Sequence, residues 1–231
     1  MKGKLQNTRL GQPLFWSFAA IVCMVLESIP SFDVFAQQLF FQHDEWLISK
    51  AFHNSHKLLL YTGPKGILVC IGAAFLLLFG ATFLSRFGST LRQWRIPALL
   101  LILSLACIPL AISTLKGLTG VYSPVDLLPY GGRHPHIGFL SHLYIYGTVD
   151  GGRSFPAGHA SGGFALMALY YLPVRKGVRI LLLCLGLLAG WGMGIYQMAR
   201  GEHFLSHTLT TMFLALAIIT FWEKLIRSSQ K

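Results

Sequence analysis

The chain has 231 residues, of which 54% are hydrophobic and only 12% are charged. Its mean hydropathy of +0.58 is high for a soluble domain, so the composition favours a protein that crosses a membrane several times. The formal net charge of +11 raises the question of nucleic acid. The basic residues, however, form small clusters between apolar runs and not a stripe with interleaved aromatic residues. We therefore expect membrane lipids, and no nucleic acid, as partners.

Six apolar runs follow one another along the chain, and about 20 residues span the hydrocarbon of a bilayer. No small-residue cleavage site follows the first run, so we interpret it as a membrane helix and not as a signal peptide. The four cysteines lie inside such runs without metal-ligand spacing, which argues against a disulfide framework. We predict an all-α polytopic membrane protein with six transmembrane helices, at about residues 13–29, 66–85, 96–115, 156–172, 180–197 and 203–221.

Two long polar segments separate these runs. Segment 31–65 is rich in His and aromatic residues, and we expect it to hold an interfacial helix around 35–41 or to lie over the membrane surface. Segment 117–155 is rich in Gly, His, Pro and Tyr. A loop of this length is usually functional or disordered, and its aromatic content argues against disorder. In the fifth run, glycines spaced by four residues predict close helix packing, at Gly186, Gly190 and Gly194.

The basic clusters predict the orientation of the chain. If the N-terminus is inside, every inside segment is short and basic, as the positive-inside rule requires. Both termini are then cytoplasmic, and ionisable residues collect at the outer ends of spans three to six, where they usually mark function. The inside clusters are Lys2, Lys4 and Arg9; Arg86, Arg92 and Arg95; Arg175, Lys176 and Arg179; and Lys224, Arg227 and Lys231.

Two segments at the expected outer face combine histidine with arginine. The first is Gly152–Ala160, in which Pro156 opens the fourth apolar run. Proline is favoured in the first turn of a helix, and the free N–H groups that follow it attract anions. Arg153 lies just upstream of this proline, and His159 falls in the expected first turn. The segment therefore has the features of an anion-binding helix start.

The second segment is Arg200–His207. His203 and His207 are four residues apart, so on a helix they share a face, and Arg200 lies three residues earlier on the same side. Two imidazoles, two guanidiniums and a helix N-terminus suggest chemistry on a phosphate. One histidine can attack phosphorus, a second can protonate the leaving oxygen, and cations can neutralise the phosphoryl oxygens. This chemistry needs no metal and no other cofactor.

These residues resemble the type 2 phosphatidic acid phosphatases, the lipid-phosphatase branch of a superfamily that includes the vanadium haloperoxidases. The family pattern is K-x6-R-P, then P-S-G-H, then S-R-x5-H-x3-D. The resemblance covers about residues 60–222 and implies a helical-bundle phosphatase core there, with an N-terminal tail, first span and outer loop in 1–59 and a cytoplasmic tail in 223–231. The corresponding stretches are Lys116-x6-Ser123-Pro124, Pro156-Ala157-Gly158-His159 and Tyr196-Gln197-x5-His203-x3-His207.

The resemblance implies a role for four matched residues. Lys116 would bind phosphate oxygens, and Gly158 would donate its backbone N–H to the phosphate. His159 would be the general acid for the leaving group, and His203 would be the nucleophile. From the sequence alone, Lys116 is also compatible with an ordinary interfacial lysine whose ammonium reaches the membrane surface.

The chain departs from the family pattern at four positions. Ser123 and Gln197 stand where the family has arginine, and Ala157 stands where it has serine. His207 replaces the aspartate that orients the nucleophile. We expect a neutral His207 to accept the N–H of His203 and so to fix its tautomer, although a packed structural role for His207 is an equal alternative.

Nearby arginines offer a replacement for the missing guanidiniums. Arg153 and Arg200, with Arg133 as an alternative, can restore a positive cradle for phosphate. Arg200 is one helical turn from the glutamine at 197 and can face the same side. Arg153 has a second interpretation, a loop salt bridge with Asp150.

The function expected from these residues is hydrolysis of a lipid phosphate or pyrophosphate at the outer face of a bacterial inner membrane, through a phosphohistidine. Candidate substrates are undecaprenyl pyrophosphate, lipid A phosphates, phosphatidic acid and phosphatidylglycerol phosphate. One alternative is a lipid phosphotransferase that uses the same site. The others are a metal-binding membrane protein, with three histidines as ligands, and a non-catalytic relative of the family.

Overall fold

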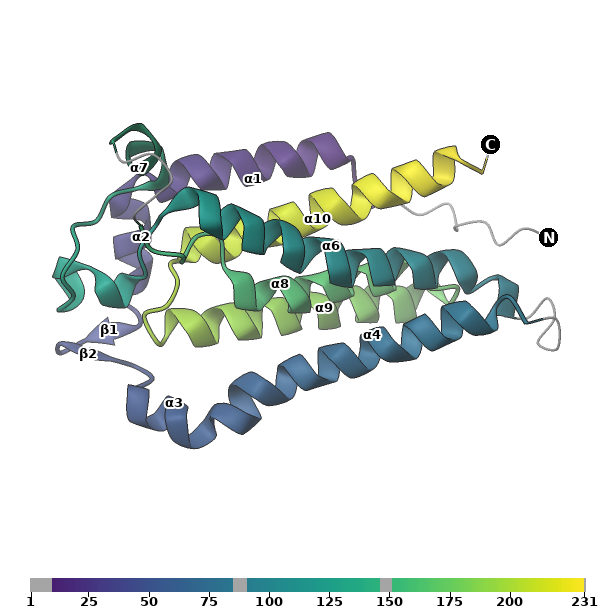
Figure 1. Ribbon diagram of the computed structural model, residues 1–231, viewed down its shortest axis with the longest axis horizontal. Helices are drawn as coiled ribbons and strands as arrows, with labels where there is room; N and C mark the ends of the chain where they lie inside the picture. Colours follow the sequence, from purple (N-terminus) through teal and green to yellow (C-terminus); the bar gives the residue numbers. More distant parts are fainter. Residues whose placement is uncertain (1–9, 85–90, 146–150, 231) are drawn as a thin grey trace.

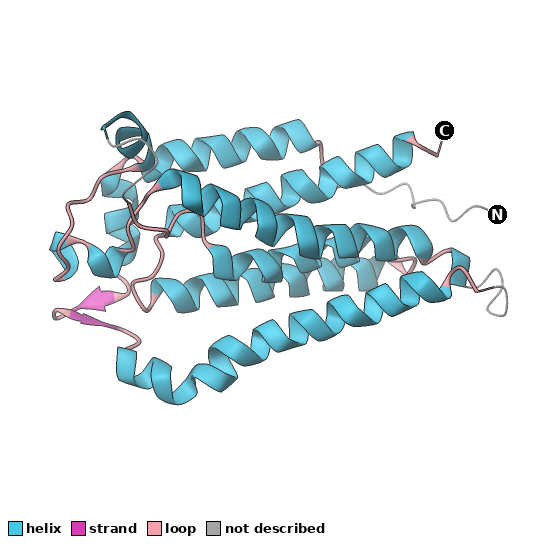
Figure 2. Ribbon diagram, viewed as in Figure 1, coloured by secondary structure: helices cyan, strands magenta, loops and turns pink. Residues whose placement is uncertain are grey.

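The computed structural model describes residues 10–84, 91–145 and 151–230, and its long helices lie side by side along one axis (Figure 1). Almost all of its regular structure is helical, as the sequence predicts (Figure 2). Several residues named above lie outside the described ranges, namely Lys2, Lys4, Arg9, Arg86, Asp150 and Lys231.

Four helical segments of the described chain are long and apolar enough to cross a membrane: Lys50–Ala81, Arg95–Asp126, Lys176–Met198 and Leu205–Ser228. A fifth is possible if α1 and α2, which meet at an angle of 84°, form one broken span. The predicted count of six is therefore not confirmed. The elements that make up these segments are α1 (Pro13–Glu27), α2 (Pro30–Gln37), α3 (Lys50–Lys57), a π-helical turn (Leu58–Thr62), α4 (Gly63–Ala81), α6 (Arg95–Thr119), α9 (Lys176–Met198) and α10 (Leu205–Ser228).

The predicted fourth span is a short central element and not a full membrane helix. It consists of α8 (Gly158–Ala165) followed by a 3-10 helix (Leu166–Tyr171), and it packs against α6, α9 and α10 in the middle of the bundle. Phe164, Met167 and Ala168 on this element are fully buried and form part of the main hydrophobic core. The sequence of this element is rich in Gly and Ala, as is usual for a helix that other helices enclose closely.

The glycines of α9 allow this enclosure, which confirms the packing predicted for them. A Cβ atom on Gly190 would lie 2.2 Å from Cδ1 of Phe164, and one on Gly186 would lie 2.6 Å from the backbone nitrogen of Met167. A Cβ on Gly194 would lie 2.5 Å from Cγ2 of Thr208 in α10. Because contacts this short do not occur in packed proteins, only glycine lets α8 and α9 approach so closely.

Two buried carboxylates connect α1 and α2 to other helices through hydrogen bonds. Asp33 in α2 accepts hydrogen bonds from the backbone N–H and the hydroxyl of Ser206, at 2.9 and 2.5 Å, and so caps the start of α10. Glu27 at the end of α1 accepts the backbone N–H of Phe139 at 2.6 Å, at the start of α7 (Phe139–Ile145). Both carboxylates are fully buried.

A two-stranded hairpin follows α2, where the sequence suggested an interfacial helix around 35–41. That helix ends at Gln37, and β1 (Phe41–Gln42) pairs antiparallel with β2 (Glu45–Trp46) (Figure 2). The ring of Trp46 lies against Gly201, where a Cβ would be 2.5 Å from Cε2 of the indole. The hairpin thus supports the loop between α9 and α10.

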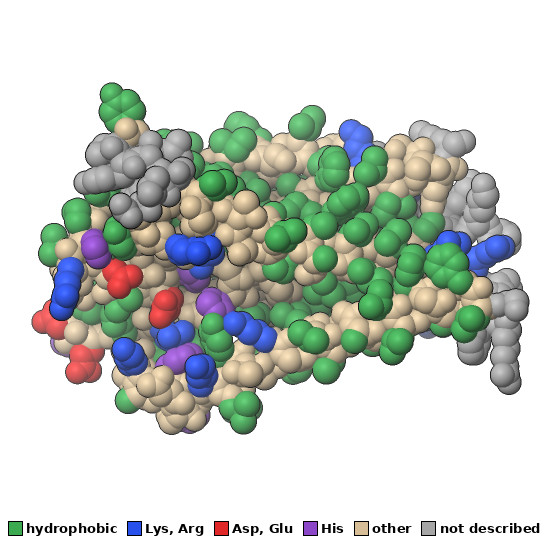
Figure 3. All heavy atoms as spheres, viewed as in Figure 1, with side chains coloured by type: hydrophobic (Ala, Val, Ile, Leu, Met, Phe, Trp, Pro, Cys, Tyr) green, Lys and Arg blue, Asp and Glu red, His purple; other side chains and the backbone are tan. Residues whose placement is uncertain are grey.

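Polar side chains separate to the two ends of the molecule. Histidine, acidic and basic side chains gather at the end that holds α3 and the hairpin, and a broad apolar band separates them from basic side chains at the other end (Figure 3). The start of α1 and the end of α10 lie at that other end (Figure 1). This separation is what the charge pattern of the sequence predicts, and the direction in which the bundle crosses a membrane stays a prediction.

The packing of α8 on α9 generates a stability prediction. We expect Gly190→Ala to lower the free energy of unfolding by about 1–3 kcal/mol, because the new methyl group overlaps the ring of Phe164. Gly192→Ala is the matched control, since nothing lies within 4 Å of its Cβ position on the same helix. Thermal unfolding in detergent measures both. Equal melting temperatures for the two variants would contradict the close approach.

Candidate active site

The segment 152–157 is held as an extended connection between the end of α6 and the start of α10. The N–H of Ser154 donates to the carbonyl of Val121 at 2.9 Å, and the Thr119 hydroxyl donates to the carbonyl of Phe155 at 2.5 Å. The N–H of Ala157 donates to the carbonyl of His207 at 3.2 Å. These bonds join three sequence-distant segments at one point and fix where α8 begins.

The helix start differs from the prediction by two residues. Pro156 was expected in the first turn, but α8 begins at Gly158 with Ala157 as its N-cap, and no side chain caps it. The physical reason is that Pro156 and Ala157 belong to the extended connection, where the N–H of Ala157 is already paired. The N–H groups of the first turn remain available to an anion, as expected for an uncapped helix start.

His203 and His207 meet at one serine hydroxyl. Nδ1 of His203 lies 3.0 Å from Oγ of Ser154, and Nδ1 of His207 lies 3.3 Å from the same oxygen. The hydroxyl itself lies 2.6 Å from the carbonyl of Glu202 and donates to it. Both imidazoles are buried, with 2% and 0% of their surface exposed.

This arrangement fixes the tautomer of both rings. A hydroxyl has one proton, and Ser154 gives it to a carbonyl, which can only accept. The serine oxygen must therefore accept from the histidines, so each Nδ1 carries its proton and each Nε2 presents a lone pair. Nε2 of His203 and Nε2 of His207 are both buried without a hydrogen-bond partner in the described structure. The site therefore holds two buried, unprotonated imidazole nitrogens.

Two details of the predicted histidine pair are wrong. His203 precedes α10, which begins at Leu205, so the two histidines do not share a helical face. The nitrogen of His203 expected to contact His207 contacts Ser154 instead. The physical reason is the end of α9. There Gly201 adopts the left-handed conformation, with φ of 74°, and the Glu202 N–H donates back to the carbonyl of Gln197 at 2.9 Å.

His159 lies near His203 at the start of α8. Its ring centroid is 6.0 Å from that of His203. Its Nε2 lies 2.6 Å from the hydroxyl of Tyr61, which comes from the π-helical turn before α4. Nδ1 of His159 is buried without a partner in the described structure. Sequence reasoning missed Tyr61, because nothing near it in the chain marks it as part of a histidine site.

Lys116 and Arg153 supply positive charge where α6 ends. The Nζ and Cδ atoms of Lys116 lie 3.5 Å from the position of a Cβ on Gly158, so the ammonium covers the start of α8. A guanidinium nitrogen of Arg153 lies 3.7 Å from the Cβ position of Gly117, beside Lys116, and the side chain is exposed. Both cations are therefore brought together with the first turn of α8.

Arg200 contacts Gln197, the residue that stands where the family pattern has its second arginine. Its Nη1 donates to Oε1 of Gln197 at 2.8 Å, and its Nη2 pairs with Oε1 of Glu202 at 3.0 Å. The guanidinium is largely buried, with 14% of the side chain exposed. Arg133 differs, because its side chain is exposed and only its backbone has a described contact, to Asp126. The structure thus brings Arg200 to the position of Gln197.

Ser123 accepts the Asp126 N–H at its carbonyl, at 2.9 Å, and its place in the phosphate site stays a prediction. It precedes the 3-10 turn Pro124–Asp126, and the next residue but one, Val125, donates its N–H to the carbonyl of Gly201 at 2.9 Å. This bond ties the first part of the family pattern to the third.

The electrostatic environment favours neutral histidines. Burial lowers the pKa of His203 well below its ordinary value, and His207 and Lys116 lower it further. Burial also lowers the pKa of His159, to about 3, with a further contribution from Lys65 and then Lys116. The site is therefore a buried cluster of neutral imidazoles within a ring of cations, a combination that suits an anion. Within the described residues no group of three or more His, Cys, Asp or Glu side chains can hold a metal ion.

Fold and side chains together describe a membrane-type helical bundle whose polar end gathers histidines and cationic side chains. Residues 97–230, more than half of the chain, match the family model of the PAP2 superfamily. The chain therefore belongs to the PAP2 superfamily, which includes the type 2 phosphatidic acid phosphatases. Membership implies a phosphatase, a hydrolase of phosphate esters. No curated protein and no solved structure matches the chain.

The shared serine generates a kinetic prediction. Removing the hydroxyl in Ser154→Ala leaves two buried N–H groups without an acceptor and frees both rings to change tautomer. We expect the turnover number for phosphate release to fall about 10- to 100-fold, which corresponds to about 1.4–2.7 kcal/mol. KM should change little, because no phosphate-binding group is lost.

The control is Ser104→Ala, which removes a buried hydroxyl that bonds only to the carbonyl of Leu100 within α6. It should retain turnover within twofold. Full turnover in Ser154→Ala, with the melting temperature of the control, would remove this serine from the mechanism.

Proposed function

We propose that this protein hydrolyses a lipid phosphate or pyrophosphate through a phosphohistidine on His203. The observation that supports this most is the bond between Nδ1 of His203 and Ser154, which leaves Nε2 as a buried lone pair without a hydrogen-bond partner in the described structure. The Lys116 ammonium covers the uncapped start of α8 in the same site. A neutral, oriented imidazole next to anion-binding groups is what attack on phosphorus requires.

In the first step, Nε2 of His203 attacks phosphorus, and the bond from phosphorus to the lipid oxygen breaks. His159 gives a proton to that oxygen. In the second step, water attacks the phosphohistidine and gives a proton to His159, which releases inorganic phosphate and restores both histidines. Lys116, the N–H of Gly158 and Arg200 hold the three phosphoryl oxygens as charge moves between them.

His159 must be protonated to act as the acid, and the substrate provides the condition. The cations that lower its pKa are the groups that a phosphate would neutralise. When the anion binds, their repulsion toward a charged imidazole falls, and the negative phosphate stabilises the imidazolium. We therefore infer that the pKa of His159 rises when the substrate binds, so that His159 becomes protonated in the enzyme–substrate complex.

The proposed location is a bacterial inner membrane, with both termini in the cytoplasm and the site on the periplasmic side. The support is the charge separation described above, because basic residues mark the end of the bundle opposite the histidines. The lipid head group would then reach the site from the outer leaflet while its chains stay in the bilayer.

The test is phosphate release by the detergent-purified protein from a panel of lipid phosphates and pyrophosphates, with chelator present. We expect chelator-resistant release, and a loss of at least about 1,000-fold in His203→Ala, because the nucleophile is gone. The matched control is His56→Ala, which removes an exposed histidine on α3 that bonds to the Phe52 carbonyl. Acid-labile phosphate trapped on the wild type and absent from His203→Ala would identify the intermediate.

Release that stops when metal is chelated would favour a metal-dependent site instead. Phosphate trapped on His203 without release into water, but with transfer to an added lipid acceptor, would make the protein a phosphotransferase. An unlabelled His203 and no release from any lipid of the panel would overturn the proposal in favour of a non-catalytic relative.

The replaced arginine generates a second prediction. Arg200→Ala removes the guanidinium that Gln197 positions, and we expect kcat/KM to fall about 10- to 100-fold. Arg133→Ala is the matched control, because its exposed side chain has no described contact with the site, and it should stay within twofold. Equal and small losses in the two variants would remove Arg200 from the phosphate cradle.

A further inference from the structure

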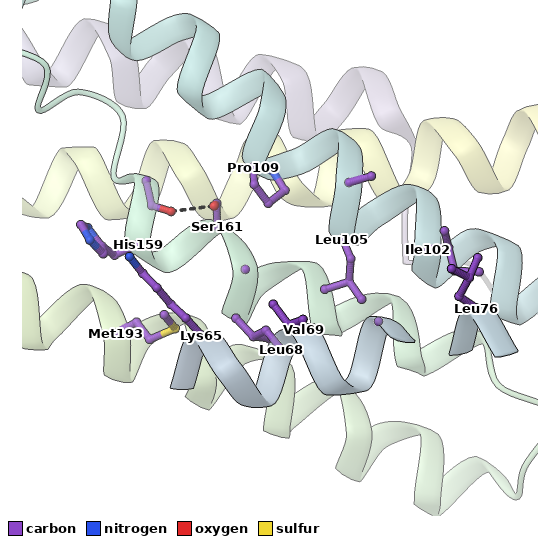
Figure 4. Close-up of a pocket in the computed structure, with 14 residues that line it drawn as sticks. Lys65, Leu68, Val69, Leu76, Ile102, Leu105, Pro109, His159, Ser161 and Met193 are labelled. Carbon is purple, nitrogen blue, oxygen red and sulfur yellow. Dashed lines mark hydrogen bonds between the residues drawn. The ribbon is translucent and has the colours of Figure 1, made fainter. Parts of the chain in front are cut away.

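An apolar groove of about 520 Å³ leads away from His159 between α4, α6 and α8 (Figure 4). Leu68 and Leu105 line its middle, and Leu76 and Ile102 lie at the end farthest from the histidine. The groove has the chemistry of a site for a hydrocarbon chain, and it is continuous with the side of the site on which the proposed leaving group departs.

The mouth of this groove has a cation that the family pattern does not include. Lys65 lies in the first turn of α4. It lines the groove together with His159, and its side chain extends toward that histidine (Figure 4). Its Nζ lies 3.9 Å from the ring centroid of Tyr61, whose hydroxyl bonds to His159. Lys65 and Tyr61 both lie outside residues 97–230, the region that matches the family.

The cations around the site divide between its two sides. Lys116 lies over the start of α8 and contributes to the lowered pKa of both His203 and His159. Lys65 lines the groove beside His159, and its ammonium lies over the ring of Tyr61, whose hydroxyl bonds to His159. Lys116 thus belongs with the phosphoryl group under attack, and Lys65 belongs with the leaving group.

A cation on the leaving-group side distinguishes two classes of lipid. If the substrate is a monophosphate ester, the leaving group is an alcohol, which is neutral once His159 has protonated it and gains little from a nearby ammonium. If the substrate is a diphosphate ester, the leaving group is itself a phosphate and remains anionic. A positive charge placed there stabilises the departing phosphate throughout the reaction.

We propose that Lys65 binds the inner phosphate of a lipid diphosphate, whose hydrocarbon chain occupies the groove; this rests on the proposed function. Nε2 of His203 attacks the terminal phosphorus, and the bond from that phosphorus to the bridging oxygen breaks. The proton of His159 goes to the bridging oxygen, so the products of the first step are phosphohistidine and a lipid monophosphate held by Lys65. Water then releases inorganic phosphate from His203.

The experiment compares farnesyl diphosphate with farnesyl monophosphate, two probes that share one chain and differ by one phosphate. We expect Lys65→Gln to lower kcat/KM for the diphosphate at least tenfold, which is about 1.4 kcal/mol, and to leave the monophosphate within twofold. Lys65→Arg should restore the diphosphate rate. The control Lys57→Gln, which removes a basic residue of α3 outside the groove lining, should change neither.

The outcomes separate this inference from the function on which it rests. Equal losses for the two probes in Lys65→Gln would overturn it, since the lysine would then not distinguish the second phosphate. A wild-type protein that hydrolyses farnesyl monophosphate or phosphatidic acid but not the diphosphate would also overturn it, while the proposed function stands. Retained activity in His203→Ala would overturn the proposed mechanism itself. The monophosphate rate of Lys65→Gln reports that the variant is folded.

Discussion

The site depends on how one serine proton is used. Ser154 gives its proton to the carbonyl of Glu202, so its oxygen must accept from His203 and His207. An aspartate in the position of His207 would add a negative charge beside the nucleophile. A serine orients the nucleophilic imidazole without adding charge, so the positive charge of the neighbouring cations is not offset before the phosphate binds. In the proposed mechanism, the missing carboxylate and the missing arginines therefore belong together, because fewer cations are needed where no buried anion opposes them.

The position of Ser154 and of the two histidines depends on the close packing of α8 against α9. A Cβ on Gly163 would lie 2.5 Å from the backbone nitrogen of Gly190, so α8 and α9 touch backbone to backbone. This approach places the start of α8 between the end of α6 and the start of α10, where the connection 152–157 bonds to both. The packing of small residues in the apolar layer thus determines the distances between polar groups at one end of it.

The sequence is sufficient for the features that depend on local pattern. Apolar runs predict the long helices, and motif spacing singles out His159 and His203, whose ring centroids lie 6.0 Å apart. Features set by tertiary contacts are not predictable in this way. The partners of the two histidines, Ser154 and Tyr61, come from segments about 50 and 100 residues away. His203 lies outside its expected helix because Gly201 turns the chain. The fourth apolar run forms a short element that other helices enclose, and not a span.

The part of the chain outside the family match completes the site and is not an appendage to it. Asp33 caps the helix that carries His207, and the hairpin supports the loop that carries Arg200. Tyr61 then contacts His159 directly. The catalytic groups proposed here belong to the matched region, whereas one wall of the groove on the leaving-group side comes from α4, and Tyr61 of the π-helical turn contacts His159 beside its mouth. Because the chemistry at phosphorus is common to all phosphate esters and the leaving group is not, differences in substrate should arise from this wall.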